Sequence, residues 1–162
     1  HEFSPSRLLT NGHLQSMYMI GYGIAVAKRE TVFGVTFEWE IIHLKDGGNL
    51  ALDWASDNNS FDEILIIFPG ITGTCKDIYI ISTIKKLESK GLKCVIANHW
   101  GAPGTKLSTP WLYSMGSSED IGEVFEYMFS KYPFANISAL GFSLGANLLT
   151  KYLGESKENW LK

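Results

Sequence analysis

The sequence is poor in cysteine, which limits the chemistry open to it. Only two cysteines, Cys75 and Cys94, occur among 162 residues. Two are too few for a disulfide framework, and this favours an intracellular, reducing location. Cys94 lies in an apolar run and is expected to be a small core residue, whereas Cys75 lies in a loop. No cluster of His, Cys and Asp has the spacing of metal ligands, so we expect no metal site.

The sequence also lacks an excess of positive charge and any long hydrophobic run. Its formal net charge of −3 and its isoelectric point near 5.8 give no basic surface for nucleic acid. The longest apolar runs, such as residues 64–68 and 78–81, are far too short to span a bilayer. Residues 70–73 (Gly-Ile-Thr-Gly) are not followed by the Lys-Ser or Lys-Thr of a nucleotide-binding loop. We therefore expect no transmembrane segment, no cofactor and no nucleic-acid partner.

The composition is instead that of a folded domain. Hydrophobic residues make up 45% of the chain and aromatic residues 13%, which is enough to build a core. A length of 162 residues fits one domain of ordinary size. Residues 1–34 show the least regular pattern, and Gly-Tyr-Gly at 21–23 interrupts any long periodicity. We therefore divide the chain into an irregular N-terminal segment, residues 1–34, and a domain over residues 35–162.

Hydrophobic periodicity predicts alternating strands and helices from residue 35. Residues 35–44 and 50–55 are predicted to form a hairpin around the turn at 46–49. Continuous apolar runs at 63–68 and 92–97 are typical of strands buried on both faces. A further strand is predicted at 136–140, and helices are predicted at 77–90, 117–131 and 146–153. This order favours an α/β fold that opens with an antiparallel hairpin and continues with parallel strands and helices.

The most informative motif is Gly-Phe-Ser-Leu-Gly at residues 141–145. It follows a predicted strand and precedes a predicted helix, which is the context of a nucleophile elbow. In such a turn the hydroxyl of Ser143 is exposed at a strained backbone position, and the helix N-terminus favours developing negative charge. The alternative is a Gly-rich strand–helix turn in an ordinary α/β protein, in which Ser143 only caps the helix.

An activated serine also needs hydrogen-bond donors for the oxyanion that forms during attack. The backbone N–H of Leu144 is the first candidate, because it belongs to the residue after the nucleophile. The Gly-rich loop at 69–74 follows the third predicted strand and offers the backbone N–H of Ile71 as the second. The alternative for this loop is a simple strand-to-helix connection.

Four segments together resemble one known family. They are residues 11–16 (Asn-Gly-His-Leu-Gln-Ser), 69–73 (Pro-Gly-Ile-Thr-Gly), 98–105 (Asn-His-Trp-Gly-Ala-Pro-Gly-Thr) and 141–147 (Gly-Phe-Ser-Leu-Gly-Ala-Asn). In this order they are similar to α/β-hydrolase-domain proteins related to the bacterial YheT-type esterases and the eukaryotic membrane-associated ABHD lipases. The resemblance implies an α/β-hydrolase fold and hydrolysis of carboxylic esters, with acyl-ester or lipid substrates. It also implies Ser143 as nucleophile and the backbone of Ile71 and Leu144 as the oxyanion hole.

The sequence departs from this family in two ways. Trp100 stands where the family usually has Arg, so the polar contacts of that loop differ. An α/β hydrolase also places its acid and then its His after the nucleophile, and no His follows Ser143. Glu155 and Glu158 follow it, but they are expected on a solvated helix face. The strands that carry the acid and base are missing, so we expect only the N-terminal portion of the fold.

The histidines of this chain all precede Ser143. His99 ends a predicted parallel strand, at the sheet edge where active-site loops gather. The favoured interpretation is nevertheless a His that hydrogen-bonds locally and shapes its own turn at 98–105. His13 is interpreted as structural or as lining the site entrance, and His43 as a half-buried strand residue.

Three interpretations follow from these residues. The first is a serine ester hydrolase, esterase-like or lipase-like, whose acid and base lie outside these 162 residues, so that the chain alone is inactive. The second is a catalytically inactive half-hydrolase that acts as a structural or interaction subunit of a larger assembly. The third, an α/β binding module without hydrolase ancestry, is disfavoured by the ordered motifs. We expect a protein partner or a C-terminal segment to cover the exposed sheet edge, and membrane association stays open.

Overall fold

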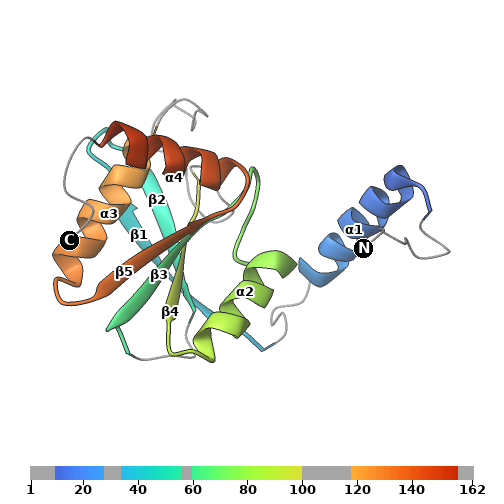
Figure 1. Cartoon of the computed structure of the whole chain (residues 1–162), viewed down its shortest axis with the longest axis horizontal. Helices are drawn as coiled ribbons and strands as arrows, with labels where there is room; N and C mark the ends of the chain where they lie inside the picture. Colours follow the sequence, from blue (N-terminus) through green and yellow to red (C-terminus); the bar gives the residue numbers. More distant parts are fainter. Residues whose placement is uncertain (1–9, 28–33, 56–59, 100–117, 157–162) are drawn as a thin grey trace.

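The computed structural model describes residues 10–27, 34–55, 60–99 and 118–156 (Figure 1). From residue 35 on, each predicted strand and helix is confirmed to within about two residues at its ends. The helices are α1 (Gly12–Ala27), α2 (Ile78–Glu88), α3 (Glu119–Lys131) and α4 (Leu144–Glu155). The strands are β1 (Phe37–His43), β2 (Asn49–Ala55), β3 (Glu63–Phe68), β4 (Lys93–Ala97) and β5 (Asn136–Gly141).

The described strands form one mixed sheet in the order β1-β2-β4-β3-β5. The opening hairpin β1–β2 is antiparallel, and β2 also pairs with β4 in the antiparallel sense. Strands β4, β3 and β5 are parallel to one another. The predicted α/β class is therefore confirmed, and the C-terminal ends of β3, β4 and β5 meet at one edge of the sheet. Ligand sites of open α/β sheets lie at this edge.

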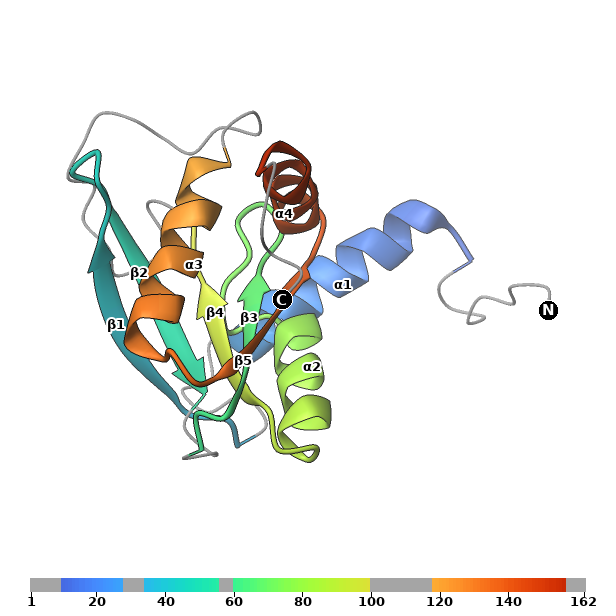
Figure 2. The same cartoon turned by 60° about the vertical axis from the view of Figure 1, so that its left-hand side comes forward.

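Helices cover both faces of the sheet, and this makes two hydrophobic layers (Figure 2). Helices α3 and α4 pack on one face, where Val124, Met128 and Leu148 meet side chains of β2, β3 and β4. Helix α2 packs on the other face through Ile80, Ile81 and Ile84. Strands β3 and β4 are covered by both layers, which explains their continuous apolar sequences.

Glycines with positive φ mark two of the predicted turns. Gly91 has a φ of +86° and follows the last turn of α2, where the sequence predicted the helix to stop. Gly47 also has a φ of +86° and lies in the turn between β1 and β2. Only glycine adopts this left-handed conformation without steric cost, so both positions fix the local chain direction.

Hydrogen bonds to one carboxylate connect α3 to the opening hairpin. The carboxylate of Glu40 on β1 accepts hydrogen bonds from Trp54 on β2 and from Tyr127 and Lys131 on α3. Burial alone would raise the pKa of Glu40, but these donors outweigh that effect and lower it. Glu40 is therefore ionised at neutral pH and links three elements at once.

Helix α1 is the element that the sequence did not predict. It runs through Gly21, although the glycines at 21 and 23 indicated an irregular segment. Both views show α1 extending away from the sheet and its covering helices (Figures 1 and 2). Its exposed side chains include Leu14, Met17 and Tyr18. Among the residues that the structure describes, no helix is both long enough and apolar enough to cross a membrane.

Candidate active site

Ser143 lies in the turn between β5 and α4, with its side chain exposed. Its backbone has φ +49° and ψ −112°, a conformation that costs a non-glycine residue about 1–3 kcal/mol. It occupies the N-cap position of α4, yet its hydroxyl makes no capping hydrogen bond. The geometry therefore argues against the alternative in which Ser143 is only a helix cap.

The two glycines of the motif are required by close backbone contacts. A Cβ built on Gly141 would lie 2.4 Å from the Cα of Ala146 at the start of α4. A Cβ built on Gly145 would lie 2.2 Å from the carbonyl oxygen of Phe68 at the end of β3. Both distances are far below any normal contact, so the turn can only be this tight with glycine at both positions.

The loop after β3 lies directly against the serine. A Cβ built on Gly70 would be 3.4 Å from the Cβ of Ser143. The Pro69 carbonyl accepts a hydrogen bond of 3.1 Å from the Gly145 N–H, which joins this loop to the start of α4. Among the described residues, neither the Ile71 N–H nor the Leu144 N–H donates a hydrogen bond to another group. Both predicted oxyanion donors therefore lie next to the turn that holds Ser143, and neither is used in a hydrogen bond within the described residues.

Backbone strain is concentrated at the same place. Within the described residues, the non-glycine residues with positive φ are Thr72, at +57°, and Ser143, at +49°. Thr72 belongs to the loop that carries Ile71, and Ser143 is the candidate nucleophile. Strained conformations of this kind gather at functional sites, because the surrounding structure must hold them.

Tyr79 supports the loop from α2, a role that no pattern in the sequence indicated. Its hydroxyl accepts a hydrogen bond of 3.3 Å from the Gly70 N–H. Its ring packs edge-on against Phe142, with ring centroids 4.8 Å apart. A Cβ on Gly73 would lie 2.6 Å from the Tyr79 hydroxyl, so the second glycine of the loop leaves room for it.

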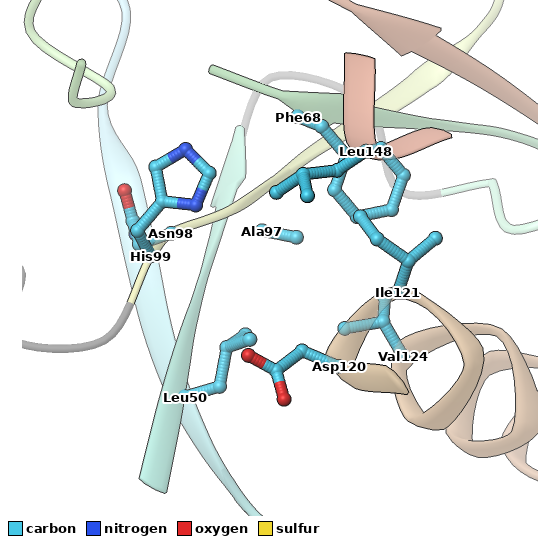
Figure 3. Close-up of a pocket in the computed structure, with 9 residues that line it drawn as sticks. All are labelled: Leu50, Phe68, Ala97, Asn98, His99, Asp120, Ile121, Val124 and Leu148. Atoms are coloured by element: carbon cyan, nitrogen blue, oxygen red, sulfur yellow. The ribbon is translucent and has the colours of Figure 1, made fainter. Parts of the chain in front are cut away.

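A small cavity opens beside the site at the C-terminal ends of β3 and β4 (Figure 3). The centre of a water-sized sphere can occupy about 20 Å³ of this cavity. That is room for one or two water molecules and not for an acyl chain. Phe68 and Leu148 form an apolar side, and the His99 ring and the Asp120 carboxylate lie on other sides of the space. Its lining residues are Leu50, Phe68, Ala97, Asn98, His99, Asp120, Ile121, Val124 and Leu148.

Asp120 was predicted only as part of a helix start, and the structure places its carboxylate in this cavity. Burial raises the pKa of Asp120 to about 6, and the carboxylates of Asp46, Glu123 and Glu119 add to the shift. The folded chain therefore binds this proton more tightly than the unfolded chain does. The contribution of Asp120 to stability is therefore fully present below its unfolded pKa of about 4 and is lost as the pH rises through about 6.

We expect Asp120→Asn to stabilise the chain by about 1 kcal/mol at pH 8 and by nothing measurable at pH 4. The gain is smaller than the full shift implies, because Asp120 is partly exposed and the N-terminus of α3 favours a negative charge there. Urea unfolding at both pH values checks this. Glu119→Gln removes a charge from the same turn outside the cavity and is expected to change stability by only a few tenths of a kcal/mol. Equal gains at both pH values would contradict the assignment.

The three histidines that the structure describes occupy separate places. His13 is exposed on α1, and His43 is exposed at the end of β1, where its Nδ1 lies 2.6 Å from the Asn49 side-chain oxygen. The prediction that His43 is half-buried is therefore wrong, because its side of β1 faces solvent. His99 is partly buried, and its Nε2 lies 3.0 Å from the Pro69 carbonyl oxygen. This contact spans 30 residues of sequence, and most of the turn at 98–105, in which a local contact of His99 was expected, lies outside the described residues.

Among the described residues, the other candidates supply no further catalytic group. Glu155 is exposed, as predicted, and pairs with Lys151 and with the Ser118 hydroxyl. Cys75 and Cys94 are both free, and burial raises the pKa of each thiol to about 12, so neither is a ready thiolate. Within the described ranges, no three His, Cys, Asp or Glu side chains are grouped to hold a metal ion. Glu158 and the segment 100–105, with Trp100, lie outside the described residues.

Comparisons with known proteins agree with this geometry. The chain is 38% identical to mouse phospholipase ABHD3 over 128 residues, which are 75% of this chain and 31% of that protein. It is 33% identical to human monoacylglycerol lipase ABHD2 over 99 residues, which are 60% of this chain and 23% of that protein. An esterase of Pyrococcus furiosus superposes with a TM-score of 0.63 at 23% identity, over 80% of this chain and 51% of the esterase. The chain belongs to the α/β-hydrolase family.

The match covers only part of the related proteins. The chain spans about a third of the length of the curated relatives it matches, and it corresponds to their N-terminal part. An α/β serine hydrolase homologue from Coxiella burnetii shares the fold over 74% of this chain and 58% of its own, with a TM-score of 0.58 and 22% identity. No protein-family model matches the chain. The described domain is therefore a partial α/β-hydrolase fold, as the sequence predicted.

Proposed function

We propose that this chain carries the nucleophile and the oxyanion donors of a serine carboxylic-ester hydrolase. The proposal rests on the exposure and the backbone conformation of Ser143. It is exposed, makes no capping hydrogen bond, and is held at φ +49° between two glycines that admit no side chain. A serine without a chemical role gains nothing from a conformation that costs about 1–3 kcal/mol.

In the proposed reaction, the Ser143 Oγ attacks the ester carbonyl carbon and the carbonyl oxygen becomes an oxyanion. The N–H groups of Ile71 and Leu144 donate hydrogen bonds to that oxygen. The Oγ proton passes through a general base to the leaving alcohol as the C–O bond of the ester breaks. Water then attacks the acyl-serine, which releases the carboxylic acid and returns the proton to Ser143.

The general base of this reaction is proposed to be a residue outside these 162. His13 and His43 are on exposed surfaces of α1 and β1, and the Nε2 of His99 is engaged by Pro69. Positioned proton transfer contributes about 10²–10⁴-fold to rate, so the chain alone is expected to turn over very slowly. The acid that orients the base is proposed to come from the same external segment or partner.

Acyl esters of the lipid type are the proposed substrates. Two relatives are named as a phospholipase and a monoacylglycerol lipase, and both share this part of the fold. Ile71, beside the serine, is 60% exposed and presents an apolar side chain at the rim of the site. A lipid substrate would bring the chain to a membrane surface, so membrane association is part of the same proposal.

A second candidate function is a structural or interaction subunit without catalysis. Strand β5 pairs with β3 on one side, and its other edge is unpaired among the described strands. An open strand edge is a template for pairing with a further segment or another chain. We propose that a partner or a C-terminal segment covers this edge in either case, and the two functions differ only in whether it brings the base.

We expect a fluorophosphonate probe to label wild-type chain slowly and at one position, Ser143. The Oγ–P bond forms, fluoride leaves and the proton goes to solvent, so the reaction needs no complete triad. Ser143→Ala is expected to abolish labelling, and Ser138→Ala, on the exposed side of β5, is expected to keep the wild-type rate. Intact-mass spectrometry gives the stoichiometry, and peptide mapping gives the position.

Three results would contradict the proposal. Equal labelling of the wild type and Ser143→Ala would show that Ser143 is not the nucleophile. Multiple-turnover hydrolysis of a short acyl ester by the 162-residue chain would show that the base lies within it. Absence of labelling in a folded wild-type chain would favour the non-catalytic subunit.

A further inference from the structure

One carbonyl oxygen joins the three loops that surround the candidate nucleophile. The Pro69 oxygen, at the end of β3, accepts a hydrogen bond of 3.1 Å from the Gly145 N–H at the start of α4. It also lies 3.0 Å from the Nε2 of His99, directly after β4. A carbonyl oxygen has two lone pairs, so it accepts from both donors at once. The segments that follow β3, β4 and β5 are therefore tied together at this atom.

The Pro69 oxygen determines which ring nitrogen of His99 carries the proton. A carbonyl oxygen only accepts hydrogen bonds, so the Nε2 of His99 must bear a hydrogen. Burial lowers the pKa of His99, and the backbone of Pro69 and Gly70 offsets this only in part. The ring is therefore neutral at pH 7, with its proton on Nε2. In this tautomer Nε2 donates to Pro69 and cannot take a proton from Ser143.

We propose that His99 is a positioning residue for the oxyanion hole, which it acts on by holding the Pro69 carbonyl and hence the following Gly70–Ile71 backbone beside Ser143. This inference rests on the proposed function. Gly70 is in contact distance of Ser143. The Pro69 carbonyl and the Gly70 N–H belong to one peptide group, which His99 and Gly145 hold at its oxygen and the Tyr79 hydroxyl holds at its nitrogen over 3.3 Å. The next peptide group, which carries the Ile71 N–H, is held at the Gly70 oxygen by the Gly73 N–H over 2.9 Å.

A less well placed Ile71 N–H is expected to slow the reaction of Ser143. Removing one oxyanion donor outright slows acyl transfer by about 10²–10³-fold. Loosening the loop leaves the donor present but less well placed, so we expect His99→Leu to slow fluorophosphonate labelling of Ser143 by about 10–100-fold. His99→Gln keeps a side-chain N–H of similar reach and is expected to recover most of the rate. His43→Leu, which changes an exposed His on β1, is expected to label at the wild-type rate.

A spectroscopic readout tests the contact without any reaction. Imidazole ¹⁵N NMR of the full chain at pH 7 is expected to show the His99 ring, identified by the signals that vanish in His99→Gln, as neutral with its proton on Nε2. A charged ring, or a proton on Nδ1, would overturn the inference. This measurement on the wild type decides the matter if His99→Leu does not fold.

The two hypotheses fail in different ways. If the wild type is not labelled at Ser143, the proposed function fails and the inference fails with it. If the wild type is labelled and folded His99→Leu reacts at the same rate, the positioning role is wrong and the proposed nucleophile stands. If His99→Gln is as slow as His99→Leu, the lost feature is not the N–H donor and the inference is again overturned.

Discussion

Gly145→Ala is expected to prevent the chain from folding, with a loss of more than about 4 kcal/mol in the free energy of unfolding. The added Cβ would lie 2.2 Å from the Phe68 oxygen and 2.6 Å from the Pro69 oxygen. Both atoms are backbone at the buried end of β3, so neither can rotate away. The helix would have to move off the sheet, and the hydrogen bond from Gly145 to Pro69 would break.

Gly154→Ala is the matched control in the same helix. Nothing lies within 4 Å of a Cβ built there, and Ala is a better helix former than Gly. We expect this variant to be unchanged or more stable by up to about 1 kcal/mol. Circular dichroism and urea unfolding compare the two. A folded Gly145→Ala chain with wild-type stability would show that α4 does not approach β3 as closely as described.

Trp54→Ala is expected to cost about 3–5 kcal/mol, the range for removal of a buried aromatic side chain. Trp54 is 7% exposed, and its ring packs against Phe61 and Tyr132 with centroids 5.6 Å away in each case. Its indole N–H also donates to Glu40 over 3.0 Å. The substitution would leave a cavity between β2 and α3 and remove one of the three donors to the Glu40 carboxylate.

Trp39→Ala provides the comparison on the neighbouring strand. Trp39 is 73% exposed, so its removal is expected to change stability by no more than about 0.5–1 kcal/mol. Urea unfolding of both variants, followed by far-ultraviolet circular dichroism, measures the difference. Similar losses for the two tryptophans would mean that the hairpin does not pack on α3 through Trp54.

The sequence was sufficient to predict elements whose pattern is local. Strands β3 and β4 were evident because both faces are covered, which leaves an unbroken apolar run. The tight strand–helix turn at 141–145 was evident because its backbone contacts can be met only by glycine at 141 and 145. In each case the constraint acts within a few residues, so it leaves a mark on the adjacent sequence.

Features that depend on distant contacts could not be predicted in this way. His99 contacts Pro69 across 30 residues, and Asp120 has a raised pKa only because the fold buries it near Asp46 and other carboxylates. Helix α1 was missed for a different reason. Its sequence has glycines and no clear polar face, so periodicity gave no signal for it.

The positive φ of Ser143 also bears on how this site would decay if selection on catalysis were lost. Most replacements would keep the backbone strain without the benefit of the hydroxyl, and a β-branched residue would increase it. Glycine alone would relax the turn, since a φ of +49° is unstrained for it. Under the proposed function, a lineage that abandons the reaction and keeps the fold is therefore expected to drift toward Gly-x-Gly-x-Gly at these positions.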